Sequence, residues 1–146
     1  MTLERGSLSE IEIKLPSDPK FLKIIRGGIS HISEICGFSS EESNAVTSAV
    51  DEAASNIIKH TYNGAKNKLI IVNFRILEDR LEIVLRDFGE KVDPETIKSR
   101  DLNEIRPGGL GVHLIKSTMD VVNYDNSFEV GNQLTMAKYL PGKKEK

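Results

Sequence analysis

A carboxylate, a carboxamide and an imidazole follow one another at intervals of four residues in DEAASNIIKHTY, residues 51–62. If this segment is an α-helix, Glu52, Asn56 and His60 stack along one side of it. An apolar stripe of the same helix runs beside the row, so the row would lie at the rim of a packed layer, where a cleft could form. An ordinary exposed polar face has the same spacing and, on spacing alone, is the simpler interpretation.

A second candidate is Asp87, which ends an apolar run and is followed by Phe88 and Gly89. A carboxylate at a strand end offers a fixed acceptor to an amino group of a ligand, and the glycine lets the backbone approach closely. A surface Asp that opens a turn has the same signature. Phe88 is bulky for a ligand pocket, but on a strand it should point to the face opposite Asp87.

A third candidate is the glycine cluster of Gly108, Gly109 and Gly111, which directly precedes an amphipathic helical pattern. Glycine inside a helix costs roughly 0.5–1 kcal/mol relative to alanine. The cluster is either a flexible connection or a phosphate cradle, in which backbone N–H groups and the positive helix end face an anion. The segment is not a P-loop, because it lacks G-x-x-x-x-G-K-[ST] and Lys116 is out of place for that motif.

Hydrophobic periodicity predicts the elements that must position these residues. The expected strands are residues 11–15, 69–77, 81–88, 121–124 and 133–140, and the expected helices are about 19–36, 42–62 and 110–119. Hairpins dominate this order, which is not the strict strand–helix alternation of a Rossmann domain. The charged segment 89–107, with a short helix expected at 94–99, is typical of a functional lid.

Composition bounds the class of protein. The chain has 146 residues, 38% of them hydrophobic and 29% charged, and a net charge of −2. These values are typical of one globular domain and argue against a nucleic-acid binder that works by neutralising phosphates. The single cysteine, Cys36, excludes an intrachain disulfide. Without an apolar stretch of membrane-spanning length or a signal-peptide pattern, we expect a cytoplasmic protein with no membrane partner.

Taken in order, three motifs resemble the N, G1 and G2 boxes of the GHKL ATPase superfamily. They are Glu52-x-x-x-Asn56, Asp87-x-Gly89 and Gly108-Gly109-Leu110-Gly111. The closer resemblance is to the anti-sigma-factor serine/threonine kinases, which are bacterial partner-switching regulators. Further similar features are His60 and Tyr62 after the N box, Gly-Leu-Gly-x-x-Leu-Ile at 109–115 and the closing run at 135–140. One departure is the G1 box, which lacks the second glycine that many superfamily members carry.

The resemblance implies a fold and a domain organisation. The fold is an α/β two-layer sandwich of a mixed, mostly antiparallel sheet with helices on one face, the Bergerat ATP-binding fold. A single kinase domain would span residues 1–146, with short flexible tails at about 1–9 and 142–146.

The resemblance also assigns roles to the candidate residues, with ATP and Mg²⁺ as cofactors. Asn56 would bind Mg²⁺, and Glu52 would be the general base on the attacking hydroxyl. Asp87 would accept a hydrogen bond from the adenine amino group, Gly89 would let the backbone close on the base, and Thr135 would be a second adenine contact. The phosphates would be contacted by Gly109, Leu110 and Gly111. Arg100 or Arg106 either reaches the γ-phosphate or is an ordinary solvated charge.

The implied function is that of an anti-sigma factor and protein serine/threonine kinase. It would phosphorylate an anti-sigma-factor antagonist with Mg-ATP, sequester a sigma factor and form a homodimer, with no direct nucleic-acid partner. Two alternatives stay open: a related switch kinase that activates a phosphatase, and a nucleotide-dependent binding module without catalysis. The presence of Glu52 argues against the second alternative, because a pure binder needs no base.

Overall fold

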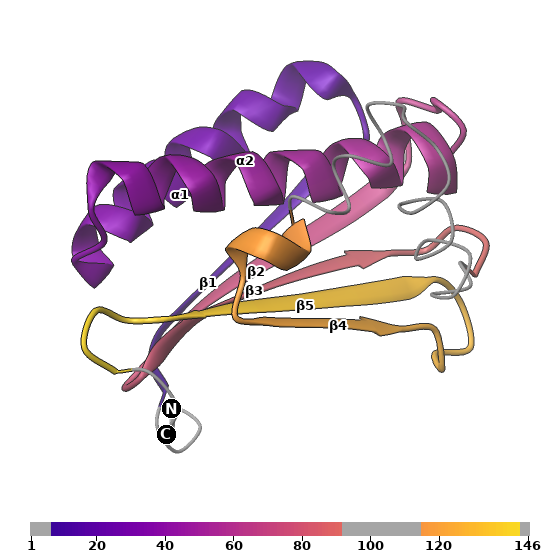
Figure 1. The fold of residues 1–146 in the computed structure, drawn as a ribbon. Coiled ribbons are helices and arrows are strands. Elements are labelled where there is room, and N and C mark those ends of the chain that lie inside the picture. Colours follow the sequence, from indigo (N-terminus) through magenta and orange to yellow (C-terminus); the bar gives the residue numbers. More distant parts are fainter. Residues whose placement is uncertain (1–6, 92–114, 144–146) are drawn as a thin grey trace.

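In the computed structural model, two helices lie across one face of a five-stranded sheet (Figure 1). The structure describes residues 7–91 and 115–143. The strands are β1 (Ser7–Pro16), β2 (Leu69–Leu77), β3 (Arg80–Asp87), β4 (Val121–Asp125) and β5 (Asn132–Tyr139). The helices α1 (Leu22–Cys36) and α2 (Ser40–Asn56) connect β1 to β2, with a 3-10 turn at Pro19–Phe21 before α1 and a π-helical turn at Ile57–Thr61 after α2.

The strand order is β1-β2-β3-β5-β4, and all four pairings between these strands are antiparallel. The two-layer α/β fold is therefore confirmed, but the expected mixed sheet is wrong for the described strands. The physical reason lies in the connections. The α1–α2 pair returns the chain to the end where β1 stopped, so that β2 runs back along β1. Strands β3 and β4 do run in the same direction, but β5 lies between them.

Local sequence signals set the ends of the two helices. The Asp18 side chain accepts a hydrogen bond from the Lys20 N–H at 3.0 Å before α1, and Gly37 ends α1 in the left-handed conformation with φ 84°. Ser39 and Glu42 form a reciprocal capping box at the start of α2, with distances of 2.9 and 3.1 Å. Such caps satisfy backbone N–H groups that the first helical turn leaves unpaired. The main difference from prediction is that α2 is α-helical only to Asn56.

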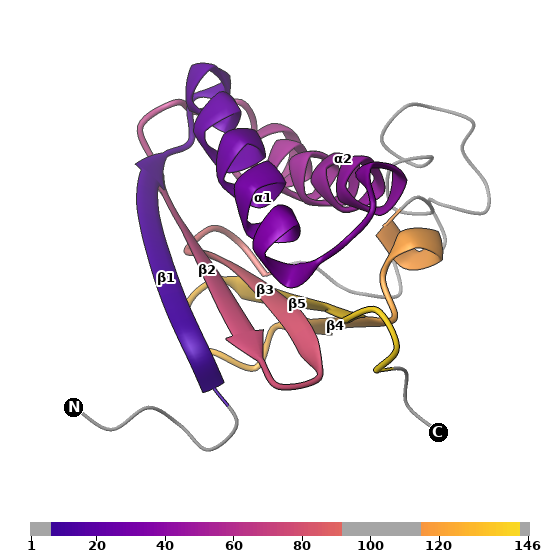
Figure 2. The same ribbon diagram turned by 90° about the vertical axis from the view of Figure 1, so that its left-hand side faces the viewer.

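The core lies between the sheet and the two helices (Figure 2). Its fully buried members include Ile25, Ile29, Val46, Ala49, Val50, Ile70, Val72, Phe74, Leu81, Ile83, Leu85 and Met136. Along β3, alternate residues face the helices, and the sequence Leu81, Ile83, Leu85 continues with Asp87. The same alternation that builds the core therefore carries a carboxylate to the end of its buried row.

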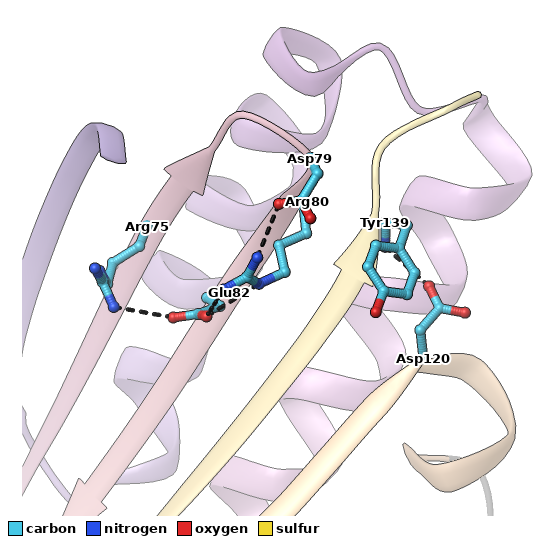
Figure 3. A network of polar contacts seen from close by, with 6 residues as sticks. All are labelled: Arg75, Asp79, Arg80, Glu82, Asp120 and Tyr139. Atoms are coloured by element: carbon cyan, nitrogen blue, oxygen red, sulfur yellow. Dashed lines mark hydrogen bonds and ion pairs between the residues drawn. The ribbon is translucent and has the colours of Figure 1, made fainter. Parts of the chain in front are cut away.

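The sheet face away from the helices carries paired charges (Figure 3). Glu82 accepts hydrogen bonds from Arg75 at 3.1 Å and from Arg80 at 2.9 Å, and Arg80 also bonds Asp79 at 2.8 Å. At the start of the sheet, Ser7 and Ser9 pair with β2, so residues 7–9, which were expected in the N-terminal tail, belong to β1. None of the helices in the described ranges is long and apolar enough to span a membrane.

Candidate functional site

Glu52 and Asn56 lie one turn apart at the C-terminal end of α2, and both are half-buried. The carboxamide oxygen Oδ1 of Asn56 is buried and has no hydrogen-bond partner within residues 7–91 and 115–143. Leaving a buried acceptor unsatisfied costs about 1–3 kcal/mol. An unpaired oxygen at a helix end, beside a carboxylate, is therefore a position where a bound ligand or cation would supply the missing interaction.

The pKa of the Glu52 carboxyl group is raised above its ordinary value. Desolvation is the main cause, and the negative charge of Asp51 adds to it, whereas the positive charge of Lys59 acts in the opposite direction. A carboxylate with a raised pKa holds an accepted proton better near neutral pH. Glu52 is thus chemically suited to act as a general base.

The helix widens directly after Asn56. The N–H of Tyr62 donates to the carbonyl oxygen of Ile57 at 2.8 Å, five residues earlier, which defines the π-helical turn. His60 is exposed, although we expected it to lie in one polar row with Glu52 and Asn56. π-helical turns inside longer helices occur frequently at functional sites. Here the turn separates the two half-buried polar side chains from the exposed histidine.

Tyr62 fastens the end of this helix to the sheet. Its ring is buried, and its hydroxyl donates to the carbonyl oxygen of Leu69 at 2.5 Å and accepts from the N–H of Phe88 at 2.8 Å. A Cβ atom on Gly89 would lie only 2.6 Å from Thr61 Cγ2 and 3.1 Å from Tyr62 Cε1. Close packing of the 87–89 turn against the end of the helix therefore requires glycine at position 89.

Asp87 is 3% exposed and lies on the helix face of the sheet, at the end of β3. Its Oδ1 accepts hydrogen bonds from Asn132 Nδ2 at 3.0 Å and from the N–H of Gly89 at 3.1 Å. Desolvation raises the pKa of the carboxyl group, and these hydrogen bonds oppose the increase. The result is a buried carboxylate held in one orientation, which can act as an acceptor for a specific donor group.

The structure brings Asn132, and not Thr135, to this carboxylate. In the β3–β5 register Asp87 pairs with Asn132, whereas Thr135 pairs with Val84 and faces the other side of the sheet. Thr135 was expected as a second adenine contact, and the structure places it on the face of the sheet opposite the Asp87 carboxylate. The sequence did contain the signal: Leu134 and Met136 alternate with Thr135, and two large apolar residues fix the core face of a strand.

Phe88 points away from Asp87, as expected for the next residue on a strand. Its side chain is 40% exposed, and the Arg86 guanidinium lies 4.6 Å from its ring centroid. Arg86 belongs to the row of β3 that faces away from the helices. The bulky ring therefore lies with Arg86, on the face of the sheet opposite the Asp87 carboxylate.

The remaining predicted site residues lie outside the described residues. They are Gly109, Leu110 and Gly111, together with Arg100, Arg106 and the short helix expected at 94–99. Of the helix expected at 110–119, residues 115–118 are described and are helical, and Ile115 and Met119 are buried in the core. Lys138 on β5 donates to the carbonyl oxygen of Thr118 at 3.4 Å, next to the end of this helix.

Comparison with known proteins identifies the family. A protein-family model described as a histidine kinase-like ATPase domain matches residues 15–138. The chain belongs to this family. The serine-protein kinase RsbW of Bacillus subtilis (strain 168) is 34% identical over 149 residues, which cover 96% of this chain and 91% of that protein. RsbW of Staphylococcus aureus (strain MSSA476) is 37% identical over 139 residues, which cover 89% and 86%.

At these identities over most of its length, the chain is a histidine kinase-like ATPase of the RsbW group of serine-protein kinases, and the enzyme class predicted from its motifs is confirmed. Two solved structures share the fold. The crystal structure of the RsbU and RsbW domains of Rv1364c from Mycobacterium tuberculosis matches with a TM-score of 0.66 at 13% identity, over 90% of this chain and 32% of that longer chain. The SiaB–SiaC complex from Pseudomonas aeruginosa matches with a TM-score of 0.58 at 12% identity, over 92% and 91%.

Proposed function

We propose that the chain phosphorylates an anti-sigma-factor antagonist on a serine or threonine with Mg-ATP, and that it sequesters a sigma factor. The catalytic part rests on the buried Oδ1 of Asn56, which has no partner among the described residues, one turn after the desolvated carboxylate of Glu52. Kinship with serine-protein kinases named RsbW supports the choice of a protein hydroxyl as the acceptor.

The donor set around Asn56 fits Mg²⁺ brought in with a nucleotide. Mg²⁺ prefers oxygen ligands and usually keeps waters and substrate phosphates, with only one or two ligands from protein. A single unpaired carboxamide oxygen satisfies that requirement, and no cluster of three or more His, Cys, Asp or Glu side chains occurs in the part of the chain that the structure describes. When bound, the metal ion would neutralise phosphate charge, with Asn56 as its protein ligand.

Glu52 would accept the proton of the attacking hydroxyl group. As that proton moves to the carboxylate, the hydroxyl oxygen forms a bond to the γ-phosphorus, and the bond from phosphorus to the β,γ-bridging oxygen breaks. The electron pair of that bond leaves with ADP. The raised pKa of Glu52 favours proton acceptance, and its half-buried position excludes part of the surrounding water.

Asp87 would recognise adenine by accepting a hydrogen bond from its amino group. This role is supported by the burial of the carboxylate and by its fixed orientation between Asn132 and Gly89. Asn132, instead of Thr135, would be the residue of β5 that supports the base site. Gly109, Leu110 and Gly111 would donate backbone N–H groups to the phosphates.

The proposals for the partners of the chain rest on its kinship alone. An antagonist protein as substrate, a sigma factor as the sequestered partner and a homodimer as the working form are the proposals that suit an RsbW-type kinase. A pull-down with the full chain, with ATP or ADP present, tests them. Recovery of a sigma factor and of a small phosphorylatable protein supports the proposal, and recovery of a phosphatase instead would favour the alternative switch kinase.

Calorimetric titration with Mg-ATP tests the site itself. We expect wild type to bind, Asn56→Ala to lose most of the affinity, and the matched control Asn44→Ala, at an exposed position of the same helix, to bind like wild type. Binding by wild type that survives Asn56→Ala would contradict the metal role. If wild type shows no binding at millimolar Mg-ATP, the kinase proposal for this site fails.

A further inference from the structure

At the end of β3, the Arg86 side chain donates hydrogen bonds to three backbone carbonyl groups. Its guanidinium donates from Nη1 to the carbonyl oxygens of Asp87 and Asn132, the latter at 3.1 Å, and from Nη2 to that of Val130 at 2.7 Å. Two of these carbonyls belong to Asp87 and Asn132, whose side chains meet on the opposite face of the sheet. One side chain on the outer face therefore holds the backbone of both residues at the base site.

Two aromatic rings fix the guanidinium plane. The ring centroid of Phe88 lies 4.6 Å from the guanidinium carbon, and that of Phe128 lies 4.1 Å from it. Guanidinium groups stack favourably on aromatic faces, and their planar set of donors is rigid. Arg86 thus ties β3 to the β4–β5 loop, because Phe128 and Val130 both belong to that loop.

Gly131 allows this close approach. Its φ is 81°, and a Cβ atom there would overlap the carbonyl oxygen of Asp87 and lie 2.7 Å from both Phe88 Cα and Arg86 Nη1. Any other residue would push the β4–β5 loop away from the end of β3. Gly131 and Arg86 together fix the end of the β4–β5 loop against the end of β3, and this fixes Asn132 relative to Asp87.

We infer that Arg86 is a positioning residue for adenine recognition, because it fixes from the outer face of the sheet the backbone of the carboxylate and the carboxamide that meet on the inner face. The inference rests on the proposed function, in which Asp87 accepts a hydrogen bond from the adenine amino group. A lysine at position 86 keeps the positive charge, but its three N–H donors share one nitrogen, so it reproduces neither the planar fork of Nη1 and Nη2 nor the stacking on the two rings.

The test measures affinities for two nucleotides, ATP and purine riboside triphosphate, which lacks the 6-amino group. Wild type should prefer ATP. In Arg86→Lys we expect the affinity for ATP to fall about tenfold, because a small displacement of a positioned group can weaken its effect by up to about a hundredfold. The affinity for the analogue should change much less, because the analogue lacks the amino group that Asp87 would bind. A purely structural role of Arg86 would lower both affinities alike or neither.

Arg80→Lys is the matched control. Arg80 lies on the same strand and the same face as Arg86, but it bonds Asp79 and Glu82 at the far end of β3 (Figure 3). The Arg80→Lys substitution should leave the affinities for ATP and for the analogue unchanged. If Arg86→Lys does not fold, Phe128→Leu removes one stacking ring while it keeps the arginine, and it should reduce the preference for ATP in the same direction.

The outcomes distinguish failure of the positioning role of Arg86 from failure of adenine recognition by Asp87. If wild type prefers ATP, Asp87→Asn abolishes the preference and Arg86→Lys retains it, the positioning role of Arg86 is overturned while the proposed function stands. If wild type binds neither nucleotide, or binds both equally, the proposed role of Asp87 fails and the role of Arg86 fails with it.

Discussion

The three polar side chains of the candidate site differ in how their burial is compensated. Asp87 is nearly inaccessible, and its Oδ1 accepts hydrogen bonds from Asn132 and Gly89. Among the described residues, Asn56 has a buried oxygen without a partner, and the desolvation of Glu52 is opposed by the charge of Lys59. A compensated group is fixed before a ligand arrives, and an uncompensated group gains most when a ligand arrives. This contrast suits Asp87 to recognition, and suits Asn56 and Glu52 to interactions made only with bound nucleotide.

Replacing Glu52 should separate catalysis from binding. We expect Glu52→Gln to lower the rate of phosphoryl transfer by about a hundredfold or more, since a general base contributes that much. The affinity for Mg-ATP should stay close to that of wild type, because the amide preserves the shape of the side chain. Initial rates with saturating antagonist protein and calorimetric titration measure the two effects. Glu41→Gln, at an exposed position of the same helix, is the control, and equal loss of rate and affinity in Glu52→Gln would contradict the role of base.

The pH dependence of the rate should report the same carboxylate. A general base works in its deprotonated form, and the pKa of Glu52 is raised by desolvation. The rate should therefore be low in acid and rise with pH through an apparent pKa above the ordinary glutamate value. This acid limb should be absent from the residual activity of Glu52→Gln. A limb at the ordinary value, or one that persists in the variant, would assign the titration to another group.

At the scale of elements, the sequence predicts most helix and strand positions because the signals are local. The capping box at Ser39, the left-handed glycine at position 37 and the alternation of β2 and β3 each depend on a few neighbouring residues. The π-helical turn was not predictable in this way. It exists because the ring of Tyr62 packs into the core and its hydroxyl meets Leu69 and Phe88, and those contacts come from the folded sheet.

Tyr62→Phe tests this attachment of helix to sheet. The variant keeps the buried ring but leaves the N–H of Phe88 and the carbonyl oxygen of Leu69 without their partner. We expect the free energy of unfolding to fall by about 1–3 kcal/mol, the cost of unsatisfied buried groups. Chemical denaturation measures it. Because the 87–89 turn would also loosen, the affinity for ATP should fall as well. An unchanged free energy of unfolding would contradict the prediction and would show that water replaces the hydroxyl at no cost.

At the scale of the molecule, the site depends on strands that are distant in sequence. Asp87 and Asn132 become neighbours because β5 pairs with β3 and the register of that pairing places the two residues opposite each other. Strand order of this kind is set by long-range pairing, which hydrophobic periodicity does not encode. The sequence therefore predicted the two hairpins, β2–β3 and β4–β5, but not the order of the five strands in the sheet. For the same reason Asn132 was missed as a partner of Asp87, whereas Glu52, Asn56 and Asp87 were proposed as site residues from motifs.

Because nucleotide would join α2, β3 and β5, binding should stabilise the whole fold. At a free concentration one hundred times the Kd, a ligand that binds only the folded state adds about 2.7 kcal/mol. For a domain of this size each kcal/mol raises the Tm by about 2–4 °C. Thermal unfolding should therefore shift upward with Mg-ATP, and much less with ATP in excess EDTA. In Asn56→Ala the difference between these two conditions should vanish, because the variant lacks the oxygen that would bind the metal ion. A Tm shift in wild type that is the same with and without Mg²⁺ would contradict the proposed binding of Mg²⁺ by Asn56, and it would leave the proposed adenine recognition by Asp87 unaffected.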